Sequence, residues 1–300
     1  MTRRLRGLLL WLLLCAAPAH AANYSVFCSQ QSRLSAEQKN RMLLFSDSIR
    51  SVLQQSGHDL ALVARAGIDL DRFGLRYSHA GISLKQSGNT PWSVRQLYYS
   101  CAESRPMLYD QGLAGFMIDQ NNSRTPFVSL VFLSGAAERE LEHSALDNAL
   151  ALRMLSGTYS ADAYAFSTTY QNCNQWLLEM LAHAWGHLPD SGDVRADAQQ
   201  WLQGQRYQPS RIEVHNPLIL LGGMLMPLLH NADHPAQNLR QGVYEVSLPG
   251  SLEAFVQHQQ PQAARVEMCM NERQIVIHHG WDEIAQGCVA APADSVLPLS

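Results

Sequence analysis

The sequence predicts an α+β fold, and three observations lead to that prediction. A capping box at Ser35 opens an amphipathic helix, several short runs of β-forming residues with turn signals follow, and helical spacing of apolar residues returns from about residue 138. The chain has 300 residues, 46% of them apolar and 16% charged. This composition supports one large domain or two small ones with real cores.

The first element is a predicted secretory signal sequence over residues 1–21. It has three arginines, an apolar run over 8–17 and Ala19-His20-Ala21 as a small-residue cleavage site. The apolar run is about half the ~20 residues that a membrane-spanning helix needs. Cleavage after Ala21 and a periplasmic or secreted location are therefore expected.

The first half of the mature chain predicts one helix and a small, largely antiparallel sheet. The helix begins after Ser35 and continues to Gly57. The turn-bounded runs typical of strands are 60–64, 75–84, 92–99 and 127–133.

The second half predicts a helix over 138–155, an aromatic-rich connection and a helix with Asn172 as its N-cap. We divide the chain into the signal peptide, a domain over 22–188 and an α+β extension over 189–300 that can pack on that domain. The extension predicts helices near 195–202 and from 251, a hairpin over 264–279 and an apolar stretch over 217–229. Glycines and a proline interrupt that stretch, so we interpret it as a buried helix or an apolar wall, and we expect no transmembrane span after signal removal.

Removal of the signal sequence, which includes Cys15, leaves an odd number of cysteines. In an oxidising compartment disulfides persist, so one thiol is expected to stay unpaired. We favour Cys269 with Cys288 and Cys28 with Cys101, which leaves Cys173 free, although the other connectivities stay open.

Cys173 stands in the first turn of its predicted helix. The helix dipole and the unpaired amide groups at such a position lower the pKa of a thiol and favour a nucleophilic thiolate. A cysteine hydrolase also needs an imidazole, and His79 sits on a predicted strand where Gly81 leaves room on the same face. The alternatives are a structural thiol and a core histidine.

The residues Ser78-His79-Ala80-Gly81-Ile82, followed about a hundred residues later by Asn172-Cys173-Asn174-Gln175-Trp176, carry a resemblance to a known superfamily. They resemble the circularly permuted NlpC-type papain-fold proteins, in which a histidine strand precedes the cysteine helix. Lecithin retinol acyltransferase-like proteins share that order. The resemblance covers about residues 60–185, and the whole mature chain also resembles an uncharacterised family of exported bacterial proteins.

The resemblance implies a permuted papain-like core, with a small antiparallel sheet packed on the cysteine helix and the α+β extension after it. It also implies Cys173 as nucleophile, His79 as general base and acid, and a third polar group on the strand 92–99. Gln96 is our first choice for that group and Arg95 the second, although the superfamily pattern has a Glu, Asp or His there. The backbone amide of Cys173 is expected to stabilise the oxyanion, and Tyr170 and Trp176 are our candidates for substrate binding.

We therefore expect an exported cysteine hydrolase or acyltransferase that acts on an amide or ester of a cell-wall peptide or lipid acyl group through an acyl-enzyme. The expected partner is a small-molecule, peptide or lipid substrate. The alternative is a non-catalytic periplasmic binding or assembly module on a papain-like scaffold. We expect no cofactor and no metal, although His183 and His187 have a spacing that a zinc site can use. A net charge of -4 argues against a nucleic-acid partner.

Overall fold

A large antiparallel sheet organises the computed structural model, which describes residues 34–68, 70–118, 125–224, 226 and 228–299. The predicted signal sequence and Cys28 lie outside the described residues. The sheet has eight strands in the order β10-β9-β8-β5-β1-β2-β3-β4. Their bounds are β1 Leu60–Arg65, β2 His79–Leu84, β3 Ser93–Ser100, β4 Arg105–Gln111, β5 Phe127–Phe132, β8 Ala264–Met270, β9 Gln274–His279 and β10 Ser295–Pro298. Together with the helices, this sheet confirms the predicted α+β class.

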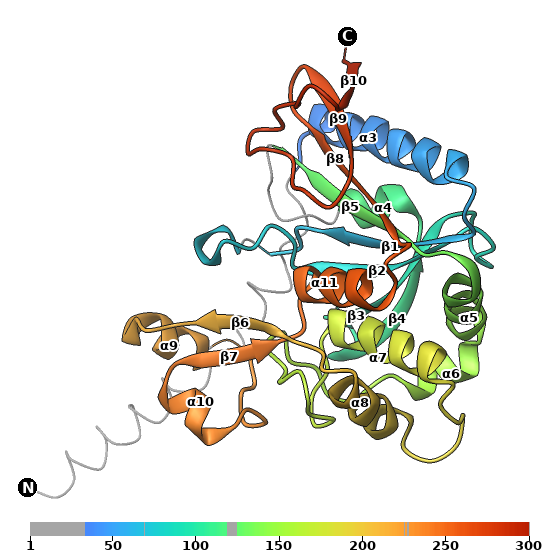
Figure 1. Ribbon diagram of the computed structural model, residues 1–300. Coiled ribbons are helices and arrows are strands. Elements are labelled where there is room, and N and C mark those ends of the chain that lie inside the picture. The colour runs from blue at the N-terminus through green and yellow to red at the C-terminus, as the bar shows by residue number, and fades with distance from the viewer. Residues whose placement is uncertain (1–33, 69, 119–124, 225, 227, 300) are drawn as a thin grey trace, which may run out of the picture.

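Helices cover both faces of the sheet (Figure 1). One face packs against α3 (Ala36–Gln55) and α4 (Leu113–Ile118). The other packs against α7 (Cys173–Gly186), which contacts α5 (Gly135–Leu146), α8 (Val194–Gly204) and α11 (Pro249–Gln259). Because every residue of β1, β2 and β5 is buried, these strands are apolar almost throughout rather than alternating with polar residues.

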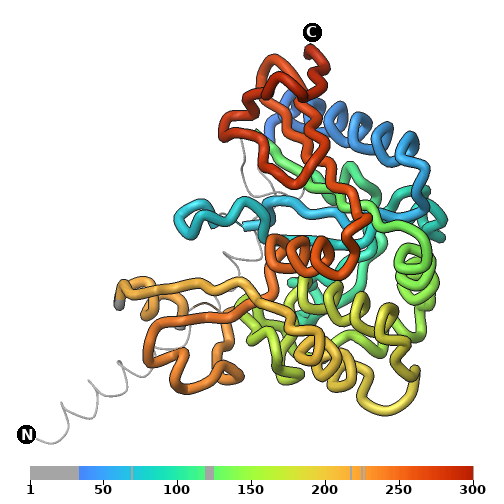
Figure 2. Tube along the Cα trace, viewed as in Figure 1, coloured from blue at the N-terminus to red at the C-terminus, as the bar shows by residue number. Residues whose placement is uncertain are grey.

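The segment after residue 189 takes part in two structures. Its strands β8, β9 and β10 continue the main sheet beyond β5. The preceding stretch forms a separate pair, β6 (Ser210–Glu213) with β7 (Val243–Val246), joined through α9 (Pro217–Met224) and α10 (Ala236–Arg240). This pair and its two helices extend away from the main sheet, beyond the N-terminal end of α7 (Figure 2). We call residues 210–248 the cap segment.

Local sequence signals explain most element boundaries. The capping box at Ser35 is present, with Ser35 Oγ accepting from the Gln38 amide and the Gln38 side chain accepting from the Ser35 amide. The helix predicted over 138–155 is two helices, α5 and α6 (Asn148–Arg153), because Asp147 is extended and its side chain caps α6. The elements not predicted from the sequence are β4, β6, β7, β10, α4, α10 and the short 3-10 helix η1 (Asp71–Phe73).

The disulfide prediction is confirmed where the described residues test it. Cys269 and Cys288 are bonded, Cys101 is in a disulfide, and Cys173 is a free, buried thiol. Cys269 lies on β8, so this bond ties the loop after β9 back to the sheet.

In the part of the chain that the structure describes, no helix is long and apolar enough to cross a membrane. Within the stretch over 217–229, residues Pro217–Met224 form the short α9, which is not a buried helix because its Leu218 and Leu221 are exposed.

Candidate active site

Cys173 is the first residue of α7 and is only 5% exposed. The preceding Asn172 is extended and caps the helix by accepting a hydrogen bond from the Gln175 amide at 2.8 Å. The Cys173 sulfur accepts hydrogen bonds from its own amide, from the amide of Asn174 and from the amide of Ala80 on β2. The predicted position at a buried helix N-terminus is thereby confirmed.

The hydrogen bond from Ala80 arises from the way β2 and β3 separate. The two strands pair over Ile82–Leu84 on β2, and β3 continues toward Ser100 paired with β4 instead. The early part of β2 therefore borders the N-terminus of α7, and Ala80, the residue after His79, donates to the thiol.

His79 opens β2, is 7% exposed and lies directly opposite Arg65 on β1. Both side chains pack on Phe116 of α4, with ring centroids 5.8 Å apart for His79 and the Arg65 guanidinium carbon 4.7 Å above the ring. The side chains of Ala80 and Ile82 point to the opposite face, toward α7, as strand alternation requires. The His79 side chain is therefore on the α4 face of the strand, and His79 lines the same cavity as Cys173.

Two glycines make this arrangement of His79 possible. A Cβ at Gly67 would lie 3.0 Å from the His79 Cβ, and a Cβ at Gly81 would lie 2.8 Å from the Arg95 carbonyl oxygen. Gly67 is held there because Ser78 Oγ accepts hydrogen bonds from the amides of Gly67 (2.7 Å) and Ile68 (2.8 Å). The serine of the Ser78-His79 pair thus closes the loop that leads into β2.

Gln96 on β3 is hydrogen-bonded to His79 through its Oε1 and the Nε2 of the imidazole. Its own Nε2 donates to Gln111 Oε1 on β4 at 2.7 Å. Because the amide nitrogen is engaged with Gln111, Gln96 presents an acceptor, and the imidazole carries its proton on Nε2. Nδ1 is then the unprotonated, basic nitrogen, and a general base for a thiol needs such a nitrogen.

Burial decides the protonation states of the pair. It raises the pKa of the Cys173 thiol to about 11, against the lowering effects of the backbone hydrogen bonds and of Arg65. Burial and the Arg65 charge lower the pKa of His79 to about 3, against the Gln96 hydrogen bond. The sequence argument predicts a lowered thiol pKa at a helix N-terminus and is wrong on this point, because desolvation exceeds the local effect of the amides. The pair is a neutral thiol and a neutral imidazole.

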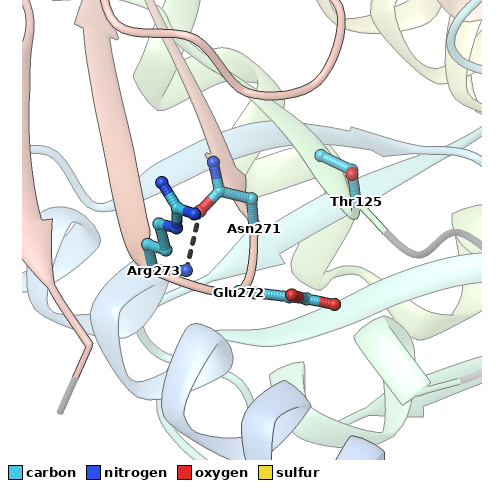
Figure 3. A pocket seen from close by; sticks show the side chains of 4 residues that line it. All are labelled: Thr125, Asn271, Glu272 and Arg273. Atoms are coloured by element: carbon cyan, nitrogen blue, oxygen red, sulfur yellow. Dashed lines mark hydrogen bonds between the residues drawn. The ribbon is translucent and has the colours of Figure 1, made fainter.

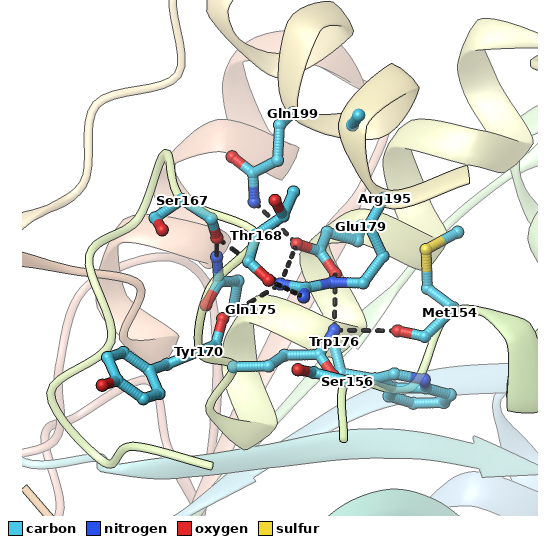
Figure 4. Close-up of polar contacts among 12 residues, drawn as sticks. Met154, Ser156, Ser167, Thr168, Tyr170, Gln175, Trp176, Glu179, Arg195 and Gln199 are labelled. Atoms are coloured by element: carbon cyan, nitrogen blue, oxygen red, sulfur yellow. Dashed lines mark hydrogen bonds and ion pairs between the residues drawn. The ribbon is translucent and has the colours of Figure 1, made fainter. Parts of the chain in front are cut away.

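A network of charged and polar side chains from α7, α8 and the connection before α7 holds the backbone that leads to Cys173 (Figure 4). Glu179 pairs with Arg195 of α8, with an Nε to Oε2 distance of 2.9 Å, and accepts from Gln199 and Gln171. Arg195 also donates to the carbonyl oxygens of Thr168 (2.7 Å) and Tyr170 (3.1 Å). The buried ion pair of Glu179 and Arg195 therefore fixes the backbone of residues 167–171, which leads to Cys173.

Asn174 joins three segments at the site. It is 1% exposed, and its Nδ2 donates to the carbonyl oxygens of Ser78 and Ser247, both at 3.1 Å. It therefore ties the histidine strand and the end of the cap segment to the N-terminus of α7.

A cavity of about 1280 Å³ contains Cys173, His79 and Gln96 in its wall. Tyrosines border it from β3, β4 and the aromatic connection, among them the predicted Tyr170. Trp176, also predicted to contact substrate, is fully buried, donates to the Ala151 carbonyl oxygen at 3.2 Å and is absent from the described cavity lining. A second pocket of about 320 Å³, formed by Thr125, Asn271, Glu272 and Arg273, holds none of the predicted site residues (Figure 3).

The remaining predicted candidates lie elsewhere. Arg95 faces away from His79 and holds Asp110 through two hydrogen bonds of 2.7 and 2.6 Å, so Gln96 is the third residue that meets the imidazole. His183 turns to Asp190 (3.1 Å) and His187 lies 3.8 Å from Glu140. Among the described residues, no group of three or more His, Cys, Asp or Glu side chains is placed to hold a metal ion.

Arg65 and Asn174 have parts in the site that the sequence analysis did not assign. The only local signal for Arg65 is a charged residue at the end of the otherwise apolar Leu60–Arg65 strand. Asn174 belongs to the Asn172-Cys173-Asn174 motif, but its contact with Ser247 joins residues 73 positions apart and has no local signature.

No curated protein and no solved structure matches the chain. One family model does, over residues 52–256, and this range includes β1 to β7 and all of the site residues above. The family is described as an uncharacterized protein conserved in bacteria (DUF2145), and the chain belongs to it.

Proposed function

We propose that this protein is an exported thiol enzyme of permuted papain-like type that transfers or hydrolyses an acyl group held in an amide or ester bond. The observation that carries the proposal is the chain of contacts from Gln111 through Gln96 to His79, in the wall of the same large cavity as a free thiol at a helix N-terminus. A nucleophile, a base and a group that orients the base are the parts that thiol acyl transfer needs.

The proposed reaction begins with both partners neutral. His79 Nδ1 removes the Cys173 proton as the sulfur attacks the substrate carbonyl, so the S–C bond forms while the imidazolium appears. The amides of Cys173 and Asn174 at the start of α7 stabilise the oxyanion. His79 then protonates the leaving amine or alcohol, and water or a second nucleophile releases the acyl group from Cys173.

Arg65 supports this sequence electrostatically. Its charge opposes the rise of the Cys173 pKa and lowers that of His79. Arg65 therefore favours the negative charge that develops on the sulfur and oxyanion, and it makes the imidazolium ready to give up its proton to the leaving group.

A second candidate function is a non-catalytic binding or assembly module. The observation in its favour is the burial of Cys173 with a pKa of about 11, which matches a structural thiol as well as a resting nucleophile. Under this candidate the cavity binds a ligand and the thiol does not react.

The two candidate functions differ in whether an acyl adduct forms on Cys173. The full-length chain is incubated with p-nitrophenyl butyrate, quenched in acid and analysed by peptide mass spectrometry. We expect a butyryl adduct on Cys173, release of p-nitrophenol, and loss of both in Cys173→Ala. Alkylation of unfolded protein confirms that Cys173 is a free thiol in the same sample. A Cys173 that is still an unacylated, alkylatable thiol after prolonged incubation with esters and amides of several acids would support the binding module instead.

A further inference from the structure

The cavity has two chemically different walls. Around Cys173 it is bordered by backbone amides and tyrosines, including Tyr159, whose pKa is raised well above its ordinary value by burial and then by the neighbouring Cys173. The cap segment contributes mainly aliphatic side chains to the other wall. These are Ile212, Val214, Leu220, Leu228, Val246 and Leu248.

The aliphatic wall begins directly beside the thiol. Ser247, between Val246 and Leu248, accepts the hydrogen bond from Asn174, the residue after Cys173. The two apolar side chains that flank this contact both line the cavity. A ligand whose carbonyl lies at Cys173 therefore meets aliphatic surface as its next contact.

Two polar residues next to this wall, Asp162 and His230, are engaged in contacts within the protein. Asp162 accepts hydrogen bonds from Ser160 Oγ and from the amide of His230 (3.0 Å), and the His230 ring stacks on Tyr170 with centroids 5.3 Å apart. These contacts hold the cap segment to the aromatic connection. The aliphatic residues of this wall offer a ligand an apolar surface that it can bury.

We propose that the aliphatic wall holds the medium or long acyl chain of a fatty ester, so that the substrate class of the site is a fatty-acyl ester. This proposal rests on the proposed thiol chemistry of Cys173. The cavity volume of about 1280 Å³ exceeds the usual range of small-molecule sites and suits an extended chain with its ester group. In the reaction the Cys173 S–C bond forms, the ester C–O bond breaks, and the thiol proton passes through His79 to the oxygen of the leaving alcohol.

Chain length is the variable that tests the proposal. The kcat/KM of the full-length chain is measured with p-nitrophenyl acetate, butyrate, hexanoate and octanoate below their aggregation limits. Each methylene moved from water into an apolar site strengthens binding by about three- to fourfold. We therefore expect kcat/KM to rise at least about tenfold from butyrate to octanoate. A flat or falling series, with Cys173 still acylated, would overturn the acyl-chain proposal and leave the proposed function intact.

Two neighbouring leucines of α9 provide a matched pair of variants. Leu220 lines the cavity, whereas Leu221 is 57% exposed and does not. Leu220→Glu is expected to remove the gain from butyrate to octanoate, whereas Leu221→Glu is expected to keep it. Equal behaviour of the two variants would contradict the assignment of the wall.

Binding without chemistry separates the two proposals further. In Cys173→Ala, which cannot be acylated, dodecanoate is expected to bind at least tenfold more tightly than butyrate by calorimetry, and Leu220→Glu in that background to remove the difference. Such binding together with no acylation of the wild type would sink the proposed catalysis but keep the acyl-chain site. No preference for dodecanoate would overturn the acyl-chain site itself.

Discussion

Two of the buried polar groups of helix α7, Cys173 at its first turn and Glu179 less than two turns later, have opposite surroundings. Glu179 is surrounded by donors and faces the guanidinium of Arg195 at 2.9 Å. Cys173 faces backbone amides and shares its cavity with a neutral imidazole that is hydrogen-bonded to a neutral glutamine. Burial raises the pKa of both groups, but of the two only Glu179 is in direct contact with a cationic side chain, that of Arg195.

The difference assigns a structural role to Glu179 and leaves Cys173 for a reactive one. A buried charge with a matched partner fixes backbone, here the residues 167–171 that lead into the site. A buried thiol without a charged partner in contact stays neutral until a substrate and a base change its state. The charged cluster of Glu179 and Arg195 therefore holds in place the neutral cluster of Cys173, His79 and Gln96.

The largest expected effect comes from breaking the charged cluster. Arg195→Met leaves the Glu179 carboxylate buried without its cation, so we expect a loss of about 3–5 kcal/mol in the free energy of unfolding. The double variant Glu179→Gln with Arg195→Met removes both charges and should lose much less. Urea denaturation of the three proteins measures this, and equal losses in the single and double variants would show that the ion pair does not hold the helix as described.

The next effect concerns the neutral cluster. Gln96→Ala removes the acceptor that fixes the His79 ring, so kcat is expected to fall by about 10- to 100-fold with the fold intact. Gln96→Glu places a carboxylate on Nε2, which favours the imidazolium and raises the pKa of His79. The acidic limb of the kcat/KM profile should then shift to higher pH in Gln96→Glu by at least about one unit. An unshifted limb would mean that Gln96 does not orient the reacting imidazole.

The protonation state of His79 also predicts a pH dependence of stability. The pKa of His79 is lowered to about 3, whereas in the unfolded chain it has its ordinary value near 6.5. Below pH 6.5 the unfolded chain binds a proton that the folded protein does not, so this contribution to stability is lost as the pH falls toward 3. The expected loss is about 1.4 kcal/mol for each pH unit in that window.

Substitution of His79 by glutamine isolates this contribution from the other histidines. The difference in unfolding free energy between the wild type and His79→Gln should shrink or reverse as the pH is lowered from 7 to 5. Parallel pH curves for the two proteins would contradict a neutral, buried His79.

The smallest effect tests the cap of α7. Asn172→Ala removes the hydrogen bond to the Gln175 amide and should cost about 1 kcal/mol of stability together with much of the activity, because Cys173 is the next residue. Asp193 caps α8 in the same way, through the Ala196 amide at 3.1 Å. Asp193→Ala should cost a similar stability without comparable loss of activity. Equal activity of the two variants would show that the α7 cap does not position the thiol.

The extent to which the sequence predicts the site follows from the range of each interaction. Cys173 at a helix start and His79 on a strand rest on capping and strand patterns that a few neighbouring residues determine. The choice of Gln96 on the next strand rests on the resemblance to the permuted papain-fold proteins. The odd number of cysteines predicts one unpaired thiol, and the favoured pairing leaves Cys173 as that thiol, which the structure confirms.

What the sequence does not predict depends on contacts between distant segments. The sign of the Cys173 pKa shift depends on burial by the sheet and the cap segment, whereas the helix start alone suggests the opposite sign. The role of Arg65 depends on its place opposite His79, and the aliphatic wall depends on residues 210–248 folding back to Asn174. The apolar stretch over 217–229 has the composition of a buried helix, yet α9 is partly exposed because it borders a cavity rather than a core.

The measurement that tests the central claim most directly is the rate of Cys173 alkylation by iodoacetamide in the folded, ligand-free, full-length chain as a function of pH. Each time point is digested, and mass spectrometry reports the labelled fraction of Cys173 alone. The account of a resting neutral pair predicts slow labelling at pH 7 that rises only above the ordinary thiol pKa of ~8.5, and Gln96→Glu should label faster at neutral pH because it stabilises the thiolate–imidazolium pair. A wild-type labelling curve that already reaches its plateau between pH 6 and 7 would contradict the account, because it would show a preformed thiolate.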